Sequence, residues 1–401
     1  MRHLLEILPN AVLPDPARET DDPGLALDPP DDEDLIRPQA EEQLLVADGR
    51  ARRSPLAKHL PWSFSPLDPA MPLPVELQVE LDGAVVVRAR VEAGFCHQGL
   101  EKRCEQVSVA QAFSLVARAA PEAPAPFEIA LATAVERLAR VRVSERVLRW
   151  RRVAIELTRI VDHTSLLLSP QLGLPRRAST ALRAVAEQSA ALLAGITTGG
   201  TFAVAGGLLR DLDDGEAETL GRSIPRLRET LEQVEPEDAF ADLGGLGCIT
   251  RQRALELGCS GPLLRACGVA DDVRLTDGWH PVVREAGCTE ARLSVRLQEC
   301  HASLTFVDQE MDKLHGMGGP HLVPLPDLLP PGIATAAVEA PDGELFVLVT
   351  SDGSGKPARV RLRPAAIALV GAIPFLLQGE SIDEIGAILA GVGLRGSALD
   401  R

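Results

Sequence analysis

The chain has 401 residues, of which 45% are hydrophobic and 24% charged, and its formal net charge at pH 7 is -16. A chain of this length and hydrophobic content can bury a substantial core and has room for two or three domains. The acidic balance argues against a nucleic-acid-binding surface, so no nucleic-acid partner is expected.

Residues 1–66 form an acidic, proline-rich leader. Residues 1–50 hold 13 acidic and four basic side chains, a net charge of -9, and seven prolines fall within residues 9–38. Such a composition cannot bury enough apolar surface to fold by itself. We therefore expect an extended arm without regular structure, either solvated or lying over a partner.

A β-hairpin is predicted over residues 73–91. An alternating apolar run is followed by Asp82-Gly83, the strongest short signal for a hairpin turn. The side chains expected on one common face are Val75, Leu77, Val79, Leu81, Val85, Val87 and Ala89.

Apolar residues at helical spacing predict a helical bundle over residues 101–313. Its helices are expected at residues 101–118, as a pair over 127–168, and at 181–194, 224–234, 249–257 and 284–313. The uncharged stretch 188–209 is long enough to cross a membrane, but its five glycines favour a buried helix followed by a loop. A basic cluster interrupts the helix pair at Arg146, Arg149, Arg151 and Arg152. We interpret it as a solvated or partner-facing surface, with a phosphate or lipid headgroup site as the alternative.

Three short strands are predicted over residues 336–362, with turns at Asp342-Gly343 and Asp352-Gly353, and helices over 365–390. The expected fold class is α+β, mainly α: a helical bundle with an N-terminal β-hairpin and a small C-terminal sheet. Residues 67–401 are expected to form one domain behind the leader.

Several motifs point to one known family. The hairpin runs into Gly94-Phe95-Cys96-His97-Gln98-Gly99-Leu100-Glu101-Lys102, and a later helix carries Glu156, Thr158, Arg159 and His163 on one face. Further on come Gly258-Cys259-Ser260-Gly261-Pro262-Leu263-Leu264-Arg265, Glu339-Ala340-Pro341-Asp342-Gly343-Glu344 and Ser351-Asp352-Gly353-Ser354. From about residue 73 to 401, this pattern resembles the 49-kDa (D-type) subunit of respiratory NADH:quinone oxidoreductase, a relative of the nickel-iron hydrogenase large subunit. The resemblance implies a hydrogenase-large-subunit-like fold.

In hydrogenases of this kind, two Cys-x-x-Cys pairs hold a nickel-iron centre, because soft thiolates suit that metal. The matching residues 118–124 contain no cysteine, and no cysteine follows Cys300, so a nickel-iron hydrogenase is excluded and no bound metal is expected. Zinc ligation by Cys96-His97 with Cys104, or by Cys300-His301, lacks paired spacing. We interpret these residues as buried thiols and hydrogen-bonded histidines. A redox pair of Cys259 and Cys267 is a further alternative.

In the quinone-reducing relatives, a His, a Tyr and an orienting Asp surround the quinone headgroup. The matching positions here are Pro72, Pro121 and Gly173, none of which can donate a side-chain proton. No catalytic residue is therefore assigned. Quinone is the cofactor that the resemblance implies for this chain, and these substitutions argue against its binding. NAD is left to other subunits, because no phosphate-binding glycine motif occurs.

The resemblance also implies residues that face an iron–sulfur cluster in a neighbouring subunit: Arg118, Gln98 and His97. Gln98 replaces an Arg of the family, and a further His position falls near Gly199. Less positive charge near a cluster lowers its reduction potential. The matching residues Glu101, Lys102, Glu156, Arg159, His163 and Arg265, with Arg292 and Arg296, are interpreted as a structural framework of buried ion pairs and turn formers.

The function expected from the resemblance is that of a subunit in a membrane-associated NADH:quinone oxidoreductase-like assembly. It would lie peripherally on the cytoplasmic side of the inner membrane, at the quinone-site position against an iron–sulfur subunit. Other complex I- or hydrogenase-like subunits would be partners, and membrane subunits indirect ones. The seven cysteines and the absence of a secretory signal agree with a cytoplasmic chain. The alternative is a catalytically silent structural paralogue in a modified complex.

Overall fold

The computed structural model describes residues 60–65, 75–95, 97–118, 123–197 and 201–394. The chain divides into two units, residues 1–56 and 57–401, and every described residue belongs to the second.

An antiparallel sheet begins the unit, in the order β1 (Leu60–Phe64), β2 (Glu76–Asp82) and β3 (Val85–Glu92). The predicted hairpin is confirmed as β2 and β3. Strand β1 was not predicted, because it lies within residues 1–66, where no regular structure was expected. That expectation was wrong for Leu60–Phe64, which pairs with β2. Residues 1–59 of the leader lie outside the described ranges.

The hairpin turn and the faces of β3 differ from the prediction. Asp82 pairs with Val85, so the turn consists of Gly83, at φ 63°, and Ala84. A bulge between Glu80 and Leu81 shifts the register, so that Val86 and Ala89 are buried while Val85 is exposed. A one-residue shift moves side chains to the opposite face of a strand.

The free edge of β3 is covered by the segment that follows helix α12 (Ala366–Leu377). The Val86 N–H donates to the Glu380 carbonyl at 2.9 Å, and the Gly379 N–H donates to the Val86 carbonyl at 2.8 Å. These bonds tie the two ends of the unit together and leave fewer exposed edge groups for unwanted pairing.

The predicted helix 101–118 is two helices, α2 (Leu100–Cys104) and α3 (Val109–Val116). Ser108 caps the second through a capping box with Gln111, which starts a new helix direction. Helix α4 (Pro124–Ala139) follows, with Pro124 in its first turn, where a proline is tolerated.

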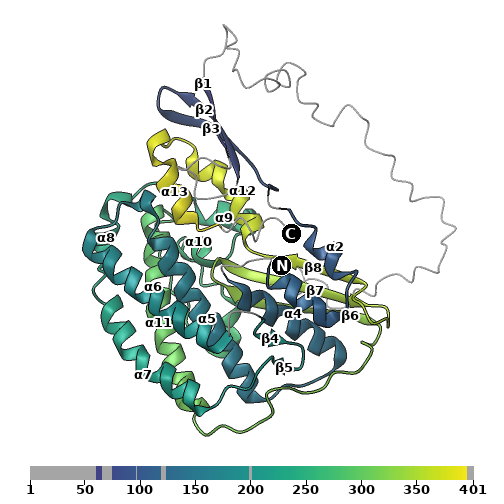
Figure 1. Ribbon diagram of the computed structural model, residues 1–401. Helices are drawn as coiled ribbons and strands as arrows, with labels where there is room; N and C mark the ends of the chain where they lie inside the picture. The colour runs from purple at the N-terminus through teal and green to yellow at the C-terminus, as the bar shows by residue number, and fades with distance from the viewer. Residues whose placement is uncertain (1–59, 66–74, 96, 119–122, 198–200, 395–401) are drawn as a thin grey trace, which may run out of the picture. The chain divides into compact units, whose positions relative to one another are not determined.

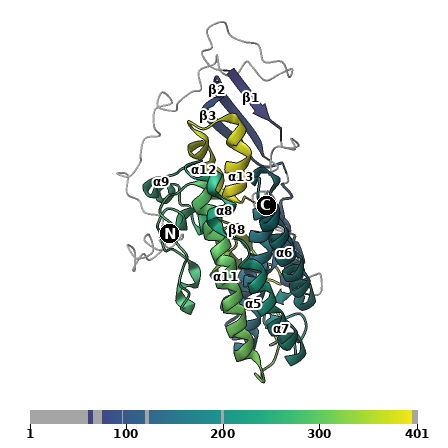
Figure 2. The same cartoon turned by 90° about the vertical axis from the view of Figure 1, so that its left-hand side faces the viewer.

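Four long helices form the predicted bundle, as Figures 1 and 2 show. They are α5 (Glu145–Leu167), α6 (Arg176–Thr197), α7 (Asp214–Leu231) and α11 (Thr289–Leu314). Helix α7 begins well before the predicted 224, because Asp213 caps it, and α11 begins after the predicted 284. Shorter elements are η1 (Pro170–Leu172), α8 (Pro236–Ala239), η2 (Ala241–Leu243), α9 (Arg251–Glu256), α10 (Gly261–Arg265) and η3 (Val273–Asp277).

The uncharged stretch 188–209 covers the end of α6 and a small hairpin, β4 (Ala203–Val204) with β5 (Gly207–Leu208). The expectation of a buried segment holds for the hairpin but was wrong for the outer side of α6, where Ala190, Ala191 and Ala194 are not buried. Within the described ranges, no helix has both the length and the apolar content needed to cross a membrane.

The predicted C-terminal strands are confirmed as an antiparallel sheet of β6 (Gly332–Ala340), β7 (Gly343–Ser351) and β8 (Arg359–Arg363). Helix α4 packs against β6 and β7. After α12 come η4 (Ile382–Glu384) and α13 (Ile385–Val392). The described unit is thus about half helical with small antiparallel sheets, which agrees with the coarser prediction of helices and sheets in separate parts of the chain.

Two of the sequence motifs meet backbone to backbone in this region. Gly261, at φ 68°, begins α10 directly against the β6–β7 turn, and a Cβ there would collide with the Asp342 carbonyl. On the other side, a Cβ at Gly343 would collide with Ser260, whose hydroxyl accepts the Glu344 N–H at 3.0 Å. The glycines of both motifs are therefore required by this close approach.

Candidate functional site

A buried network of charged side chains links the bundle to the C-terminal sheet. Helix α5 contributes Glu156, Arg159 and His163, which are 2%, 0% and 0% exposed. Their spacing places them on one helix face, opposite α11. Arg159 also reaches the sheet, because its guanidinium donates to the backbone carbonyls of Glu339 and Ala340 at 2.6 and 3.1 Å.

His163 bridges two residues of α11. Its Nε2 lies 3.0 Å from the Glu299 carboxylate, and its Nδ1 lies 3.2 Å from a guanidinium nitrogen of Arg296. A guanidinium only donates hydrogen bonds, so Nδ1 must accept and the proton belongs on Nε2, which donates to Glu299.

Arg265, fully buried at the end of α10, is the centre of the network. It pairs with Glu299 at 2.7 Å, with Glu339 at 2.7 Å and with Asp272 at 3.2 Å. One guanidinium therefore joins α10, α11, β6 and the start of η3. Buried charges are tolerated only when they are paired in this way.

Glu156 closes the network on the other side. Its carboxylate accepts from Arg159 at 3.1 Å, Arg274 at 3.0 Å and the Ser303 hydroxyl at 2.7 Å. Arg274 in turn pairs with Asp272 at 2.6 Å and stacks over the ring of Trp279 at 3.8 Å.

The pKa values of these carboxyl groups show which effect dominates at each one. Burial would raise the pKa of Glu156 and of Glu299, but the arginines around them outweigh it and hold both values below normal. At Glu339, burial outweighs Arg265 and the pKa is raised. Glu156 and Glu299 are therefore held as anions by the cations around them, which suits a structural role.

Four of the six predicted framework residues meet in this network, while Glu101 and Lys102 lie elsewhere. The Glu101 carboxylate accepts from the Leu362 N–H at 2.9 Å and from Arg361 at 2.5 Å, which ties α2 to β8. Lys102 is an exposed partner of Glu105. Glu299, Asp272 and Arg274 were not among the residues predicted from the sequence. No motif marked them, and only Arg296, one turn before Glu299, gave a signal.

The described residues among those expected at the quinone and cluster positions, Gly173, His97, Gln98 and Arg118, are not part of this network. Pro72 and Pro121 lie outside the described ranges, as do Cys96 and Gly199. Gly173 is exposed at the end of η1, and a Cβ there would meet nothing within 4 Å. His97 and Gln98 lie between β3 and α2, at the surface, and Arg118 follows α3.

The basic cluster on α5 is not the surface that we predicted. Arg151 is 2% exposed and bonds Glu136 through two nitrogens, at 2.6 and 2.9 Å. The other three arginines are paired within the chain, Arg146 with Asp211, and Arg149 and Arg152 with Glu145 and Glu310. Acidic residues distant in sequence supplied most of these partners, which a reading of α5 alone could not reveal.

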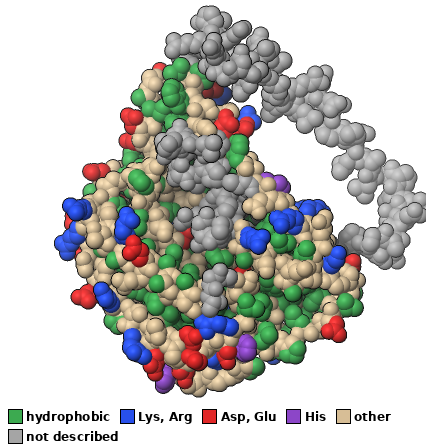
Figure 3. Space-filling view, viewed as in Figure 1, with side chains coloured by type: hydrophobic (Ala, Val, Ile, Leu, Met, Phe, Trp, Pro, Cys, Tyr) green, Lys and Arg blue, Asp and Glu red, His purple; other side chains and the backbone are tan. Residues whose placement is uncertain are grey.

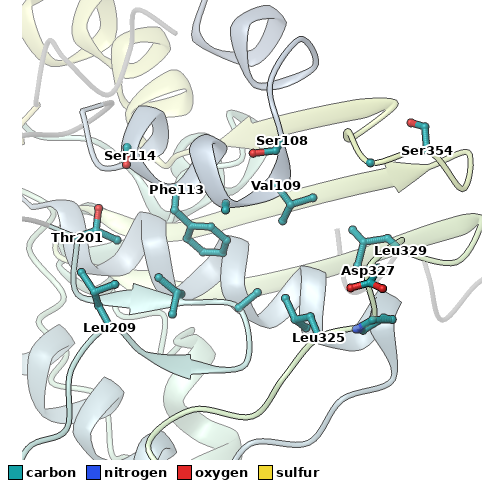
Figure 4. A pocket seen from close by; sticks show the side chains of 15 residues that line it. Ser108, Val109, Phe113, Ser114, Thr201, Leu209, Leu325, Asp327, Leu329 and Ser354 are labelled. Carbon is teal, nitrogen blue, oxygen red and sulfur yellow. The ribbon is translucent and has the colours of Figure 1, made fainter.

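A cavity of about 460 Å³ opens beside α3, the helix that precedes Arg118 (Figure 4). Its walls come from α3, the β4–β5 hairpin and residues 325–329, and are mainly apolar, with Ser114, Thr201 and Asp327 at the sides. Hydrophobic side chains spread over this part of the face, in the region of β4 and β5 (Figure 3). The cavity can receive an apolar group, but Asp327 is its single titratable lining residue among those described.

Glu128 of α4 holds the start of β4 near this cavity. Its buried carboxylate accepts the backbone N–H groups of Phe202 and Ala203 at 2.8 and 3.0 Å. Burial outweighs these hydrogen bonds and raises the pKa of Glu128 to about 7. This carboxyl group therefore changes its charge near neutral pH.

We expect Glu128→Gln to remove a pH dependence of stability. Between its ordinary pKa of 4.5 and about 7, the folded chain holds a proton on Glu128 that the unfolded chain has lost. The free energy of unfolding of the native chain should therefore fall as pH rises through this window, by roughly 2 to 3 kcal/mol relative to the variant. Urea unfolding at pH 5, 6, 7 and 8 measures this difference, with exposed Glu218→Gln as the control. A difference that does not change with pH would contradict the assignment.

Four described cysteines belong to the alternatives considered from the sequence. Cys104, Cys259, Cys267 and Cys300 are buried free thiols, and burial raises the pKa of each. Cys259 and Cys267 bond different backbone carbonyls, those of Ala368 and Leu263. Among the described residues, no three His, Cys, Asp or Glu side chains are grouped to hold a metal ion.

A comparison with known proteins shows which protein family this chain matches. Residues 181–331 and 320–401 match the family model described as respiratory-chain NADH dehydrogenase, 49 Kd subunit. The chain is 28% identical to the D-type subunit of the NADH-quinone oxidoreductase of Myxococcus xanthus, over 88% of this chain and 96% of that protein. It is also 28% identical to the D-type subunit of the same enzyme in Wolbachia sp. subsp. Brugia malayi, over 86% of this chain and 99% of that protein.

A solved structure is similar over nearly the same length. It is a chain in the membrane-bound sulfane sulfur reductase, described as an archaeal respiratory membrane complex. The sequence identity is 29%, the TM-score is 0.79, and the match covers 87% of this chain and 100% of that chain.

Proposed function

The chain belongs to the family of the 49-kDa subunit of the respiratory-chain NADH dehydrogenase, and on that premise we propose that it fills the place of the 49-kDa subunit in a complex I-related electron-transfer assembly. The main support for this proposal is that the similarity extends over 96% and 99% of the two curated relatives and over the whole of the solved chain. In this proposal the chain is peripheral, on the cytoplasmic side of the inner membrane, and packs against an iron–sulfur subunit.

The acceptor of the electrons is proposed to differ from an ordinary quinone. Pro72, Pro121 and Gly173 provide no side-chain proton donor where the resemblance implies His, Tyr and Asp. Gly173 is exposed in open space, so no neighbouring side chain within the described ranges contacts a Cβ there. The solved relative belongs to a complex named for sulfane sulfur reduction, which supports the use of this fold with another acceptor.

The alternative is a catalytically silent paralogue that holds partner subunits together. Its support is the contrast between the intact framework, in which Arg265 and Glu299 remain paired, and the substituted quinone positions. Purification of the native complex would separate the two proposals. A complex with no other member of this family makes this chain the working one, whereas a second copy that carries His and Tyr makes it a scaffold.

The face toward the iron–sulfur subunit is proposed to include Phe95, His97 and Gln98. Phe95 is 53% exposed in the loop between β3 and α2, beside both polar residues. An exposed aromatic side chain next to polar groups is typical of an interface anchor.

Phe95→Asp is therefore expected to weaken association with the iron–sulfur subunit by at least about fivefold, since truncated anchors cost more than about 1 kcal/mol. Co-purification and titration of the two subunits measure the effect. Leu275→Asp is the matched control, because Leu275 is similarly exposed at 42% but lies on η3. Equal affinities for the native chain and the Phe95 variant would remove Phe95 from the interface.

A further inference from the structure

A second cavity, of about 270 Å³, lies where α4, α5, α11, β6 and η3 meet. Arg137, Arg152 and Arg274 line it together with Trp279 and Phe306. We propose that this cavity binds a small organic carboxylate, with the charge held by Arg137 and Arg152 and a flat apolar body lying against Trp279.

The charged side chains that line this cavity have a net positive charge at its mouth. Glu156 and Glu339 also line the cavity, but each already accepts hydrogen bonds from the network, and Arg274 is shared between Glu156 and Asp272. Arg137 is exposed and donates to the Thr335 carbonyl at 2.6 Å. Within the described ranges it has no carboxylate partner.

Arg152 is only loosely held by its own chain. Its contacts with Glu145 and Glu310 measure 3.4 and 3.5 Å, at the outer limit of a hydrogen bond. Arg149 binds the same two carboxylates more closely, at 3.0 Å each. Arg137 and Arg152 are therefore the two guanidinium groups that can turn to an incoming anion, and a carboxylate matches their planar donors.

The inner wall of the cavity favours a ligand that carries an aromatic ring as well as a charge. Trp279 is 8% exposed, and its indole N–H is buried without an acceptor among the described residues. An indole nitrogen only donates, so a ligand oxygen would satisfy it. Phe306 packs edge-on against Trp279 at 5.8 Å between centroids, and Ile155 and Val338 complete an apolar wall. A flat ring covers such a surface, and an inorganic anion does not.

Three probes separate these requirements: benzoate, its neutral isostere benzamide, and inorganic phosphate, each titrated calorimetrically into the full chain. Benzoate should bind at least about tenfold more tightly than either of the others, since one well-made charge-assisted contact supplies such a factor. Arg137→Gln should weaken benzoate about tenfold. Trp279→Phe keeps an aromatic wall but removes the N–H and makes the ring system smaller, so benzoate binding should weaken by at least about threefold.

The position of bound benzoate is measured independently by tryptophan fluorescence. Benzoate should quench it in the native chain, and the quenching should disappear in Trp279→Phe while calorimetric binding persists. Arg90→Gln, an exposed arginine of β3, is the control and should change nothing. Equal binding of benzoate and benzamide, equal binding of benzoate and phosphate, an unaffected Arg137→Gln variant, or no benzoate binding at about 10 mM would each overturn the proposal.

Discussion

Arg265→Ala is expected to lower the free energy of unfolding by about 3 to 5 kcal/mol, the usual result of removing one partner from a buried ion network. Arg265 pairs with Glu299, Glu339 and Asp272, and its side chain is fully buried. Its loss leaves three carboxylates facing one another without their shared cation. Because whole domains are stable by only about 5 to 15 kcal/mol, the variant should sit close to unfolding.

The matched control is Arg222→Ala. Arg222 pairs with Glu218 at 2.6 Å, which is as short as any pair in the network, but its side chain is 75% exposed. Exposed pairs contribute about 0 to 1 kcal/mol, because water solvates both charges once the pair is broken. Chemical denaturation of both variants provides the comparison. If the two substitutions lowered the free energy of unfolding equally, burial would not be the reason that the Arg265 network stabilises the fold.

The same network shows what could be predicted from the sequence. Glu156, Arg159 and His163 were placed on one helix face by spacing alone, and they do lie there. Their partners Glu299 and Asp272 were not predicted, because both are far away in sequence and only Arg296, one turn before Glu299, gave a signal. The prediction that the arginines of α5 form a surface was wrong for the same reason. A run of charged residues is interpreted as solvated when distant acidic partners such as Glu136 and Glu310 are unknown.

Errors in the elements have local causes. The helix predicted over residues 101–118 continued through Ser108, although Ser108 and Gln111 form a capping box that starts a new helix. The bulge at Glu80 and Leu81 exchanged the faces of β3, and no turn residue marks a bulge inside an alternating strand. The long bundle helices and the C-terminal sheet were predictable, because each repeats its period over many residues.

The second large expected effect concerns Pro72, Pro121 and Gly173, the positions that the resemblance assigns to the quinone headgroup. A quinone headgroup bound there would find no donor from Pro72, Pro121 or Gly173, and an unpaired desolvated carbonyl costs roughly 1 to 3 kcal/mol. Binding should therefore be weak. Reduction should be slower still, since proton transfer from a placed side chain typically contributes about 10² to 10⁴ in rate.

We expect a Pro72→His, Pro121→Tyr, Gly173→Asp variant, assembled with its partner subunits, to reduce quinone about 100-fold faster than the native assembly, at the lower end of what a placed proton donor contributes. The replacement at Gly173 is sterically possible, because its Cβ has open space and aspartate is among the residues that tolerate a φ near 61°. Electron input into the clusters, measured with an artificial acceptor, should be the same for both and so serves as the internal control. Ordinary respiratory turnover of quinone by the native assembly, sensitive to a site inhibitor, would show that other side chains have taken over proton delivery. In that case the chain would be a working quinone-reducing subunit despite the three substitutions.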